Sequence, residues 1–302
     1  MTITAPDVDV AAARSFLIGH ARVLDRRRAE VLLDGVRGTG ALGAVEAYHN
    51  ADGGYGWGLE PDLRAPESQP GGALHAFEVF GEVGPMADPR AAELCDWLAS
   101  ITRPDGGMPF ALPVADATAT APFWAGADHG SSSLHITTAV TAAAWRVARH
   151  DPAVAAHEWL DRATRYCLDT LAARARAEFA IERLFVLDFL DTVVADGTAL
   201  EAEDLLARYA GTLPASAELS VAGGAEDEKL RPLDLSPWPD RPLRRHIDPA
   251  VIEADLDRLA GDQHPDGGWD IDFRPYSPAA ALEWRGYATV RALAVLRAHG
   301  RI

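Results

Sequence analysis

Ionisable and aromatic side chains crowd into loops that each lead into a helix rich in small residues. The residues with candidate chemical roles are, from the first loop, Trp57, Glu60, Asp62, Arg64, Glu67 and Gln69, from the middle of the chain Trp124, His129, His135 and Arg183, and from the last loop and helix Asp272, Tyr276, Glu283, Trp284, Arg285 and Tyr287. A carboxylic acid withdrawn from water can act as a general acid, because burial raises its pKa. Aromatic faces stabilise a nearby cation by ~0.5–2 kcal/mol each. The set predicts a pocket in which an acid protonates a substrate and rings stabilise the resulting charge.

Two glutamates at matching positions of a sequence repeat, Glu67 and Glu283, are the first candidates for the acid. The other expected catalytic residues, as alternative acids or as partners of the acid, are Asp62, Asp272, His135 and Arg285. Any one of the loop acids has a structural alternative, because a carboxylate at a helix N-terminus is stabilised by about 0.3–1 kcal/mol. The whole set exceeds what capping and packing require, and this excess indicates a functional pocket.

His129 and His135 flank a serine triplet at residues 131–133. Three interpretations stay open: a mononuclear metal site, a serine nucleophile activated by a histidine, or a histidine that begins a helix and hydrogen-bonds a loop carbonyl. The chain contains neither a Gly-x-Ser-x-Gly nor a His-Glu-x-x-His phrase. We therefore assign no metal ligand from the sequence.

A phrase of Asp-Gly-Gly followed by a large apolar residue occurs three times, at residues 52–55, 105–108 and 266–269. Each copy follows an amphipathic helix, and Asp-Pro at residues 88–89 and 248–249 supplies an N-cap and a first helical residue for two of these helices. A loop and a second helix follow each copy. Self-similarity at a spacing of about 50 residues predicts stacked helical hairpins, because one hairpin cannot bury its apolar face alone.

We expect one domain over residues 1–302, with repeat-like units at about 40–80, 88–148, 151–196 and 248–299. Residues 214–247 lack periodicity and are rich in proline, glycine, alanine and acidic residues. This segment is either a flap over a pocket or a degenerate hairpin. No change in composition divides the chain.

The stretch Gln263-x-x-Asp266-Gly267-Gly268-Trp269 resembles the QW-type repeat of squalene–hopene cyclases and of the β subunits of protein prenyltransferases. The resemblance covers most of the chain and implies an all-α fold, an α-α toroid whose inner helices surround a central cavity. Class II terpene cyclases protonate their substrates with a D-x-D-D motif, and the nearest matches are residues 270–273 and 60–63, which both lack the final acid. Neither Cys95 nor Cys167 has an aspartate two residues before it, so the zinc site of the prenyltransferases is absent.

No cofactor is firmly implied, although Mg²⁺ is compatible with a diphosphate substrate. Arg241, Arg244 and Arg245 form the one basic cluster. They suit either a diphosphate or carboxylate group, or pairing with neighbouring acids in a solvated loop.

The formal net charge of −17 argues against nucleic acid and anionic membrane surfaces as partners. Both cysteines lie in apolar helical patterns and are expected to be buried thiols. The sequence shows no signal-peptide pattern and no apolar run long enough to cross a bilayer. We expect a cytoplasmic protein with a small-molecule substrate; its oligomeric state is left open.

Our leading hypothesis is acid-initiated cyclisation or isomerisation of a hydrophobic, isoprenoid-like molecule in a central cavity. A second hypothesis is hydrolysis or elimination on a glycan or polar metabolite by paired carboxylates. The third is a non-catalytic barrel that binds a small molecule.

Overall fold

Aspartate followed by proline begins three helices, as the sequence predicts for two of them. The carboxylates of Asp88, Asp151 and Asp248 accept the backbone N–H two residues on, at 3.0, 2.9 and 2.8 Å. These bonds satisfy N–H groups that have no partner within the helix, and proline is tolerated there because its missing N–H is one of them.

The structure is a computed structural model that describes residues 7–199 and 201–302. Its longer helices are α1 (Val10–His20), α2 (Val23–Asp34), α3 (Thr39–Val45), α4 (Pro70–Glu82), α5 (Pro89–Ile101), α7 (Leu134–Ala148), α9 (Glu158–Ala173), α10 (Ala180–Ala195), α11 (Glu201–Ala210), α13 (Pro249–Gly261) and α14 (Pro278–Ala298). The shorter elements are η1 (Glu46–Tyr48), α6 (Pro122–Ala125), α8 (Pro152–Ala155), the antiparallel strands β1 (Leu219–Ser220) and β2 (Lys229–Leu230), α12 (Pro232–Leu235) and η2 (Pro242–His246). The prediction of an all-α chain is confirmed.

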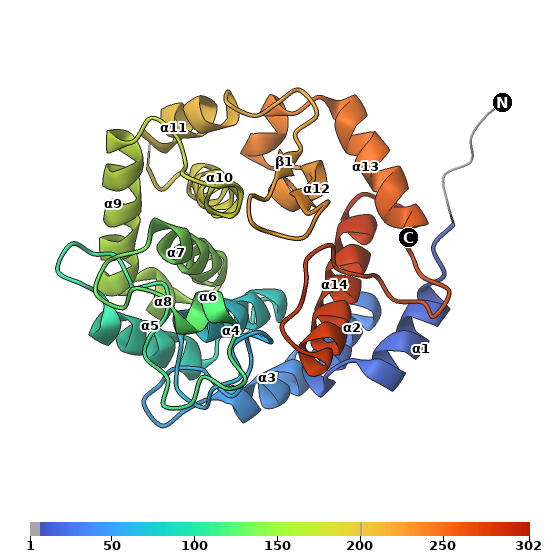
Figure 1. Cartoon of the computed structure of the whole chain (residues 1–302), viewed down its shortest axis with the longest axis horizontal. Coiled ribbons are helices and arrows are strands. Elements are labelled where there is room, and N and C mark those ends of the chain that lie inside the picture. Colours follow the sequence, from blue (N-terminus) through green and yellow to red (C-terminus); the bar gives the residue numbers. More distant parts are fainter. Residues whose placement is uncertain (1–6, 200) are drawn as a thin grey trace.

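The helices form two concentric layers (Figure 1). α2, α4, α7, α10 and α14 stand on the inside, and α1, α3, α5, α9, α11 and α13 surround them. α7 packs between α4 and α10, and α14 packs against α1 and α2, which closes the ring. The fold is an α-α toroid, as the sequence predicts. Among the described residues, no helix combines the length and apolar character needed to span a membrane.

The Asp-Gly-Gly phrase makes the same clamp in all three copies. The aspartate accepts the N–H of the second glycine and a side-chain donor near the inner helix, in the sets Asp52 with Gly54 and Ser68, Asp105 with Gly107 and Ser132, and Asp266 with Gly268 and Arg285. The first glycine of each phrase has a left-handed backbone, with φ of +89°, +97° and +92°. The phrase therefore forms a tight turn a few residues after the outer helix and ties that turn to the inner helix.

Residues 214–247 take the place of an inner helix between α10 and α14 (Figure 1). The short helix α12 packs against α10 and α13, and η2 packs against α10 and α11. Many prolines prevent a long helix here, so the inner layer is thinner in this unit. Its place in the ring fits a degenerate hairpin, and part of it also lines a pocket, so both alternatives that the sequence left open stay predictions.

The ring closes where the last repeat meets the N-terminal helix. The side-chain amide of Gln263 donates to the carbonyl of Asp9 and accepts the N–H of the same residue, both at 2.8 Å. The guanidinium of Arg285 lies 4.5 Å from the ring centre of Phe16 on α1. A Cβ at Gly267 would overlap the carbonyl group of Ala12.

We expect Gly267→Ala to lower the free energy of unfolding by about 3 kcal/mol or more, because a left-handed backbone and an overlap with α1 both oppose the new methyl group. Gly197→Ala is the matched control. It has a φ of +64° but open space around its Cβ, and should lose only about 1–2 kcal/mol. Urea denaturation measures both, and equal losses would show that the contact with α1 does not stabilise the ring.

Candidate functional site

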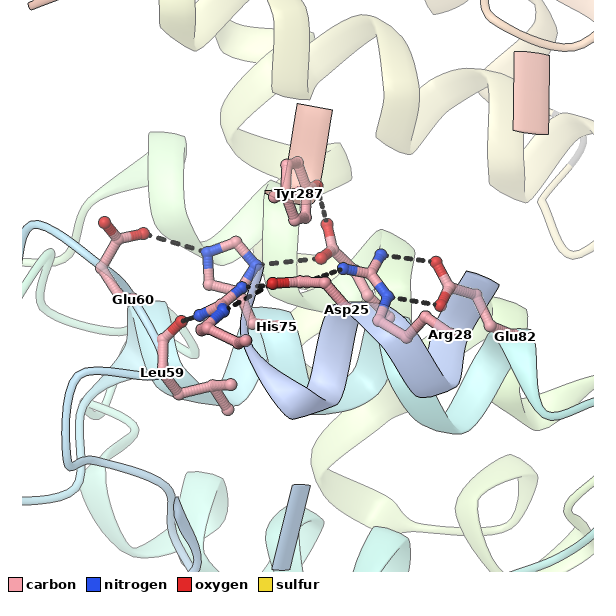
Figure 2. A network of polar contacts seen from close by, with 9 residues as sticks. Asp25, Arg28, Leu59, Glu60, His75, Glu82 and Tyr287 are labelled. Atoms are coloured by element: carbon pink, nitrogen blue, oxygen red, sulfur yellow. Dashed lines mark hydrogen bonds and ion pairs between the residues drawn. The ribbon is translucent and has the colours of Figure 1, made fainter. Parts of the chain in front are cut away.

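His75 lies in a chain of buried polar contacts that crosses the inside of the ring (Figure 2). Its Nε2 is 3.0 Å from Oε2 of Glu60, in the loop before α4, and its Nδ1 is 2.9 Å from Oε2 of Glu78, one turn further along α4. Burial alone would lower the pKa of His75, but the charges of Glu78 and Glu60 outweigh it and raise the pKa to about 9. At neutral pH an imidazolium therefore lies between two carboxylates.

Glu78 continues the chain from α4 to α14. Its Oε1 accepts the hydroxyl of Tyr287 on α14 at 2.9 Å. Burial alone would raise the pKa of Glu78, but His75 and the guanidinium of Arg28 outweigh it and hold the pKa at about 2. The carboxylate is thus ionised over the whole physiological range.

Helix α2 supplies the cations that complete this network. Arg28 binds Glu82 of α4 with two hydrogen bonds, at 2.6 and 2.7 Å, and its guanidinium lies 5.0 Å from the ring centre of Tyr287. Asp25, which is fully buried, pairs with Arg22 at 2.8 Å and with Arg28 at 3.4 Å. Arg22 also donates to the carbonyl of Leu59 at 3.0 Å and so holds the loop that carries Glu60.

Charged side chains from four inner helices stay partly accessible although they face the inside of the ring. Glu78, Asp188, Arg146 and Arg291 keep 21%, 25%, 28% and 39% of their side-chain surface. Arg146 on α7 binds both oxygens of Asp188 on α10, at 2.9 and 3.0 Å. The inside of the ring is therefore a hollow with an ionic lining at this level.

Asp62 is a buried carboxyl group, only 4% exposed, beside this hollow. Its Oδ2 accepts the indole N–H of Trp284 at 2.9 Å, and its Oδ1 accepts the backbone N–H of Tyr276 at 2.7 Å. Burial raises the pKa of Asp62; the two N–H donors oppose this, and the charge of Glu60 adds to it. Unlike Glu60, Asp62 has no cation at ion-pair distance among the described residues.

Aromatic rings form a wall on the α14 side of the hollow. The ring centres of Trp284 and Tyr287 lie 5.5 Å apart, and each packs its edge or face against His75, at 5.8 and 5.5 Å. Phe273 packs on Trp284 at 5.3 Å. These rings present π faces beside Asp62.

A second group of rings lies on the α7 side. Phe110 stacks on Trp124 at 4.3 Å, and His135 lies 5.0 Å from Phe110 and 5.1 Å from Phe185. Burial lowers the pKa of His135 to about 4, so the ring is neutral at pH 7. A Cβ at Gly71 would lie 3.2 Å from Trp124 and 3.5 Å from Glu60, which shows that this group also reaches the carboxyl pair.

A pocket of about 560 Å³ opens beside α14. It lies against the inner face of α14, the outer helix α13, the loop before α14 and the 214–247 segment, and its lining includes Arg231, Asp272, Phe273, Trp284, Tyr287 and Arg291. The pocket combines aromatic and charged surface, and two of its rings, Trp284 and Tyr287, contact Asp62 and Glu78.

The structure separates the two glutamates that occupy matching repeat positions. Glu67 precedes the first residue of α4 and lines a different groove, of about 660 Å³, together with the exposed ring of Trp57. Glu283 lies inside α14 and pairs with Arg64 at 2.5 Å. Glu283 lies within α14, which begins at Pro278, whereas Glu67 lies in the loop before α4, which begins at Pro70. The two matching repeat positions therefore direct their side chains to different places.

Several other expected site residues bind neighbouring protein groups. The side-chain amide of Gln69 bonds both the N–H and the carbonyl of Leu112, Nδ1 of His129 contacts the carbonyl of Ala111, Arg183 donates to Thr212, Arg285 pairs with Asp266 and Asp270, and Asp272 pairs with Arg231. The sequence left open such a bond for His135, whose ring instead packs against Phe110 and Phe185. The structure therefore gathers Glu60, Asp62, Trp284 and Tyr287 at one place, with Trp124 and His135 beside them.

Sequence reasoning missed His75, Glu78 and Arg28, the centre of the network. The signal was present, because His75, Glu78 and Glu82 recur at helical spacing on an otherwise apolar helix. Such residues are expensive to bury unless they are paired. Their partners on α2 and α14 are far away in sequence, so the pairing itself was not visible.

Within residues 7–199 and 201–302, no group of three or more His, Cys, Asp or Glu side chains has an arrangement suited to a metal ion.

Solved structures that include a type II terpene cyclase resemble this ring of inner and outer helices over nearly the whole chain, so the fold is terpene-cyclase-like. A protein from Actinoplanes has a TM-score of 0.56 and 14% identity, covering 96% of this chain and 99% of its own. The type II terpene cyclase MstE from Scytonema, without ligand, has a TM-score of 0.55 and 13% identity, covering 97% of this chain and 98% of its own.

MstE has also been solved, as a variant, in complex with its substrate geranylgeranyl dihydroxybenzoate. That structure has a TM-score of 0.53 and 13% identity, covering 96% of this chain and 87% of its own. No family model and no curated protein matches this sequence. At such low identity the likeness establishes the fold alone.

The His75 ion pairs predict a pH dependence of stability. The pKa of His75 is about 9 in the folded protein and 6.5 ordinarily, so its contribution is full below pH 6.5 and is lost as the pH rises through 9. The free energy of unfolding should therefore fall by on the order of 3 kcal/mol across that interval. His75→Gln should remove this slope in urea titrations at several pH values.

His246→Gln is the control, because it removes a histidine at an exposed position without breaking the buried ion pairs. An unchanged slope in His75→Gln would mean that the imidazolium does not stabilise the fold.

Proposed function

We propose that this protein is an enzyme that starts the cyclisation or isomerisation of a hydrophobic, isoprenoid-like molecule by protonating it, with Asp62 as the acid. The observation that carries the proposal is a buried carboxyl group with a raised pKa, which bonds the indole of a pocket-lining tryptophan. A general acid must hold its proton near neutral pH, and burial is how proteins achieve this.

The two carboxyl groups of the pair stand in different environments. Glu60 lies 3.0 Å from the imidazolium of His75, whereas Asp62 faces only uncharged N–H donors. Carboxyl groups whose surroundings differ in this way divide into an acid and a base. Asp62 therefore suits proton donation, and Glu60 suits proton acceptance.

The proposed reaction balances without a co-reactant. The O–H proton of Asp62 adds to one carbon of a double bond, and the other carbon becomes a cation. A second double bond of the substrate closes a ring on that cation, or no ring forms in an isomerisation. Glu60 then removes a proton from a carbon next to the final cation and forms a double bond. Glu60 then releases that proton to solvent and Asp62 takes up a new proton from solvent, which restores the enzyme, and the product is an isomer of the substrate.

The aromatic walls have the chemistry to stabilise the cation on the way. Trp284, Tyr287 and Phe273 lie on the α14 side, and Trp124 lies on the α7 side. Each face contributes ~0.5–2 kcal/mol to a cation in contact with it. Neutral His135 adds another uncharged ring to the α7 side.

Asp62 fits the acid role better than the glutamates expected from the repeat. The carboxylate of Glu283 is bound in an ion pair with Arg64, whereas Asp62 has no cation at ion-pair distance among the described residues. Glu67 faces the separate groove and accepts the N–H of Ala115 at 3.0 Å. The likeness to MstE, whose substrate is geranylgeranyl dihydroxybenzoate, supports a substrate with an isoprenoid chain.

One observation favours a second candidate function, in which paired carboxylates catalyse hydrolysis of, or elimination from, a glycan or polar metabolite. The pocket beside α14 is lined by Asp234, Asp270 and Asp272 as well as by arginines. Such a surface suits hydroxyl groups better than a hydrocarbon chain.

A substrate screen separates the two candidates. The protein is incubated in D₂O with farnesyl and geranylgeranyl compounds and with glycosides, and products are analysed by mass spectrometry. We expect an isomer of an isoprenoid substrate that carries one deuterium on carbon. Glycoside cleavage, or an isoprenoid product without deuterium, would contradict protonation of a double bond.

Asp62→Asn should lower kcat about 10²–10⁴-fold, because it removes the proton donor while keeping an acceptor oxygen. Glu67→Gln is the matched control, and it should retain activity because Glu67 lines the separate groove. Circular dichroism checks that both variants fold. Comparable activity in Asp62→Asn and the wild type would exclude Asp62 as the acid.

A further inference from the structure

The pocket beside α14 lies between two parts of the chain that have little regular structure. One side is formed by residues of the 214–247 segment and the other by the loop before α14. Figure 1 shows both reaching into the ring between α10 and α14. Arg231, from the first part, and Asp272, from the second, line the pocket and form an ion pair with each other.

The downstream half of the 214–247 segment is anchored independently of this ion pair. Leu233 donates its N–H to Asp255 of α13 at 2.9 Å. Asp191 of α10 accepts the N–H of Leu243 at 2.7 Å and pairs with Arg241 at 2.8 Å. Residues 232–247 are thus fixed to the helices on both sides.

The upstream half has no comparable anchor across the pocket. The β1–β2 hairpin packs against α10, its ion pair between Lys229 and Glu218 is internal, and residues 222–227 at its tip are exposed. Among the described residues, the Arg231–Asp272 pair is the polar contact that links this half to the loop before α14. The backbone of Arg231 is itself hydrogen-bonded to Asp234 and Leu235 of α12, so breaking the pair separates the loop that carries Asp272 from an arginine that stays in place.

The pair is accessible enough to break easily. The side chains of Arg231 and Asp272 are 21% and 40% exposed. Ion pairs at such positions contribute about 0–1 kcal/mol and weaken as salt is added. The link is therefore strong enough to favour one arrangement and weak enough to open without unfolding the ring.

We propose that Arg231 and Asp272 form a latch across the mouth of the pocket, and that its opening lets an apolar ligand enter beside Trp284 and Tyr287. The side chain of Arg231 and the loop that carries Asp272 move apart, while the backbone of Arg231 stays hydrogen-bonded to α12. The latch controls access whatever reaction the protein performs, so it goes beyond the proposed function and can be tested without turnover.

The first experiment locks the latch. Arg231→Cys combined with Asp272→Cys places two thiols across the mouth, and the native Cys95 and Cys167 are buried. Binding of the neutral dye Nile red is followed by stopped-flow fluorescence. We expect the oxidised double variant to bind the dye at least about tenfold more slowly than its reduced form. Equal rates in a sample shown by mass spectrometry to contain the disulfide would overturn the proposal.

The second experiment opens the latch. Arg231→Ala should speed dye entry about two- to fivefold, as expected for loss of a weak ion pair. In the wild type added salt should have the same effect, and in the variant it should have little. Arg149→Ala breaks an ion pair of similar exposure, with Asp196, away from the pocket, and should leave the rate unchanged. An unaltered rate in Arg231→Ala would count against the latch.

A third variant establishes where the dye binds. Ala288 lines the pocket, and Ala288→Trp should fill it and abolish the fluorescence change. If Ala288→Trp binds the dye as the wild type does, the pocket does not take up apolar ligands and the latch proposal fails. That result would leave the proposed acid chemistry untouched, because the deuterium experiment and the Asp62→Asn variant test it separately.

Discussion

The ionised carboxylate of Glu78 imposes the constraint on which the inside of the ring depends. A charge buried there is costly unless opposite charges and hydrogen-bond donors surround it. Helix α4 supplies His75, α2 supplies Arg28 and α14 supplies the hydroxyl of Tyr287. The charge of Glu78 also raises the pKa values of Arg146 on α7 and Arg291 on α14. We infer that a slip of any of these helices would leave a buried charge unpaired, so the network sets their register.

The same network contacts both ionic and aromatic groups inside the ring. The charge of Glu78 acts on Arg146, which pairs with Asp188, and the ring of His75 packs on Trp284, which packs on Phe273. The carboxyl pair joins the two kinds of group, because Glu60 reaches His75 while Asp62 reaches Trp284. Asp62 is withdrawn from water yet remains close to the charge of Glu60, which raises its pKa. That combination is what acid-initiated chemistry on an apolar substrate requires.

The toroid itself does not decide what the protein does. Helical pairs and glycine clamps can support many different loops, and function resides in the loop residues that face the hollow. The structural likeness to a type II terpene cyclase covers nearly the whole chain, but the identity is 13%. The proposed function therefore rests on the environment of Asp62 and on the pocket beside Trp284.

The features that the sequence alone determined are local ones. Asp-Pro helix starts and the three Asp-Gly-Gly turns depend on residues close together in the chain, so their spacing was sufficient to predict paired helices, whereas the toroid was implied by the resemblance of residues 263–269 to QW-type repeats. Tertiary structure decided which loop acids face inward. Glu67 and Glu283 match in the repeat, yet an earlier start of α14 sends them to different places, while Asp62 meets Trp284 and Glu78 meets Tyr287 across more than 200 residues. Such contacts depend on how the ring closes, and ring closure sums many weak interactions between distant segments, which no short sequence pattern records.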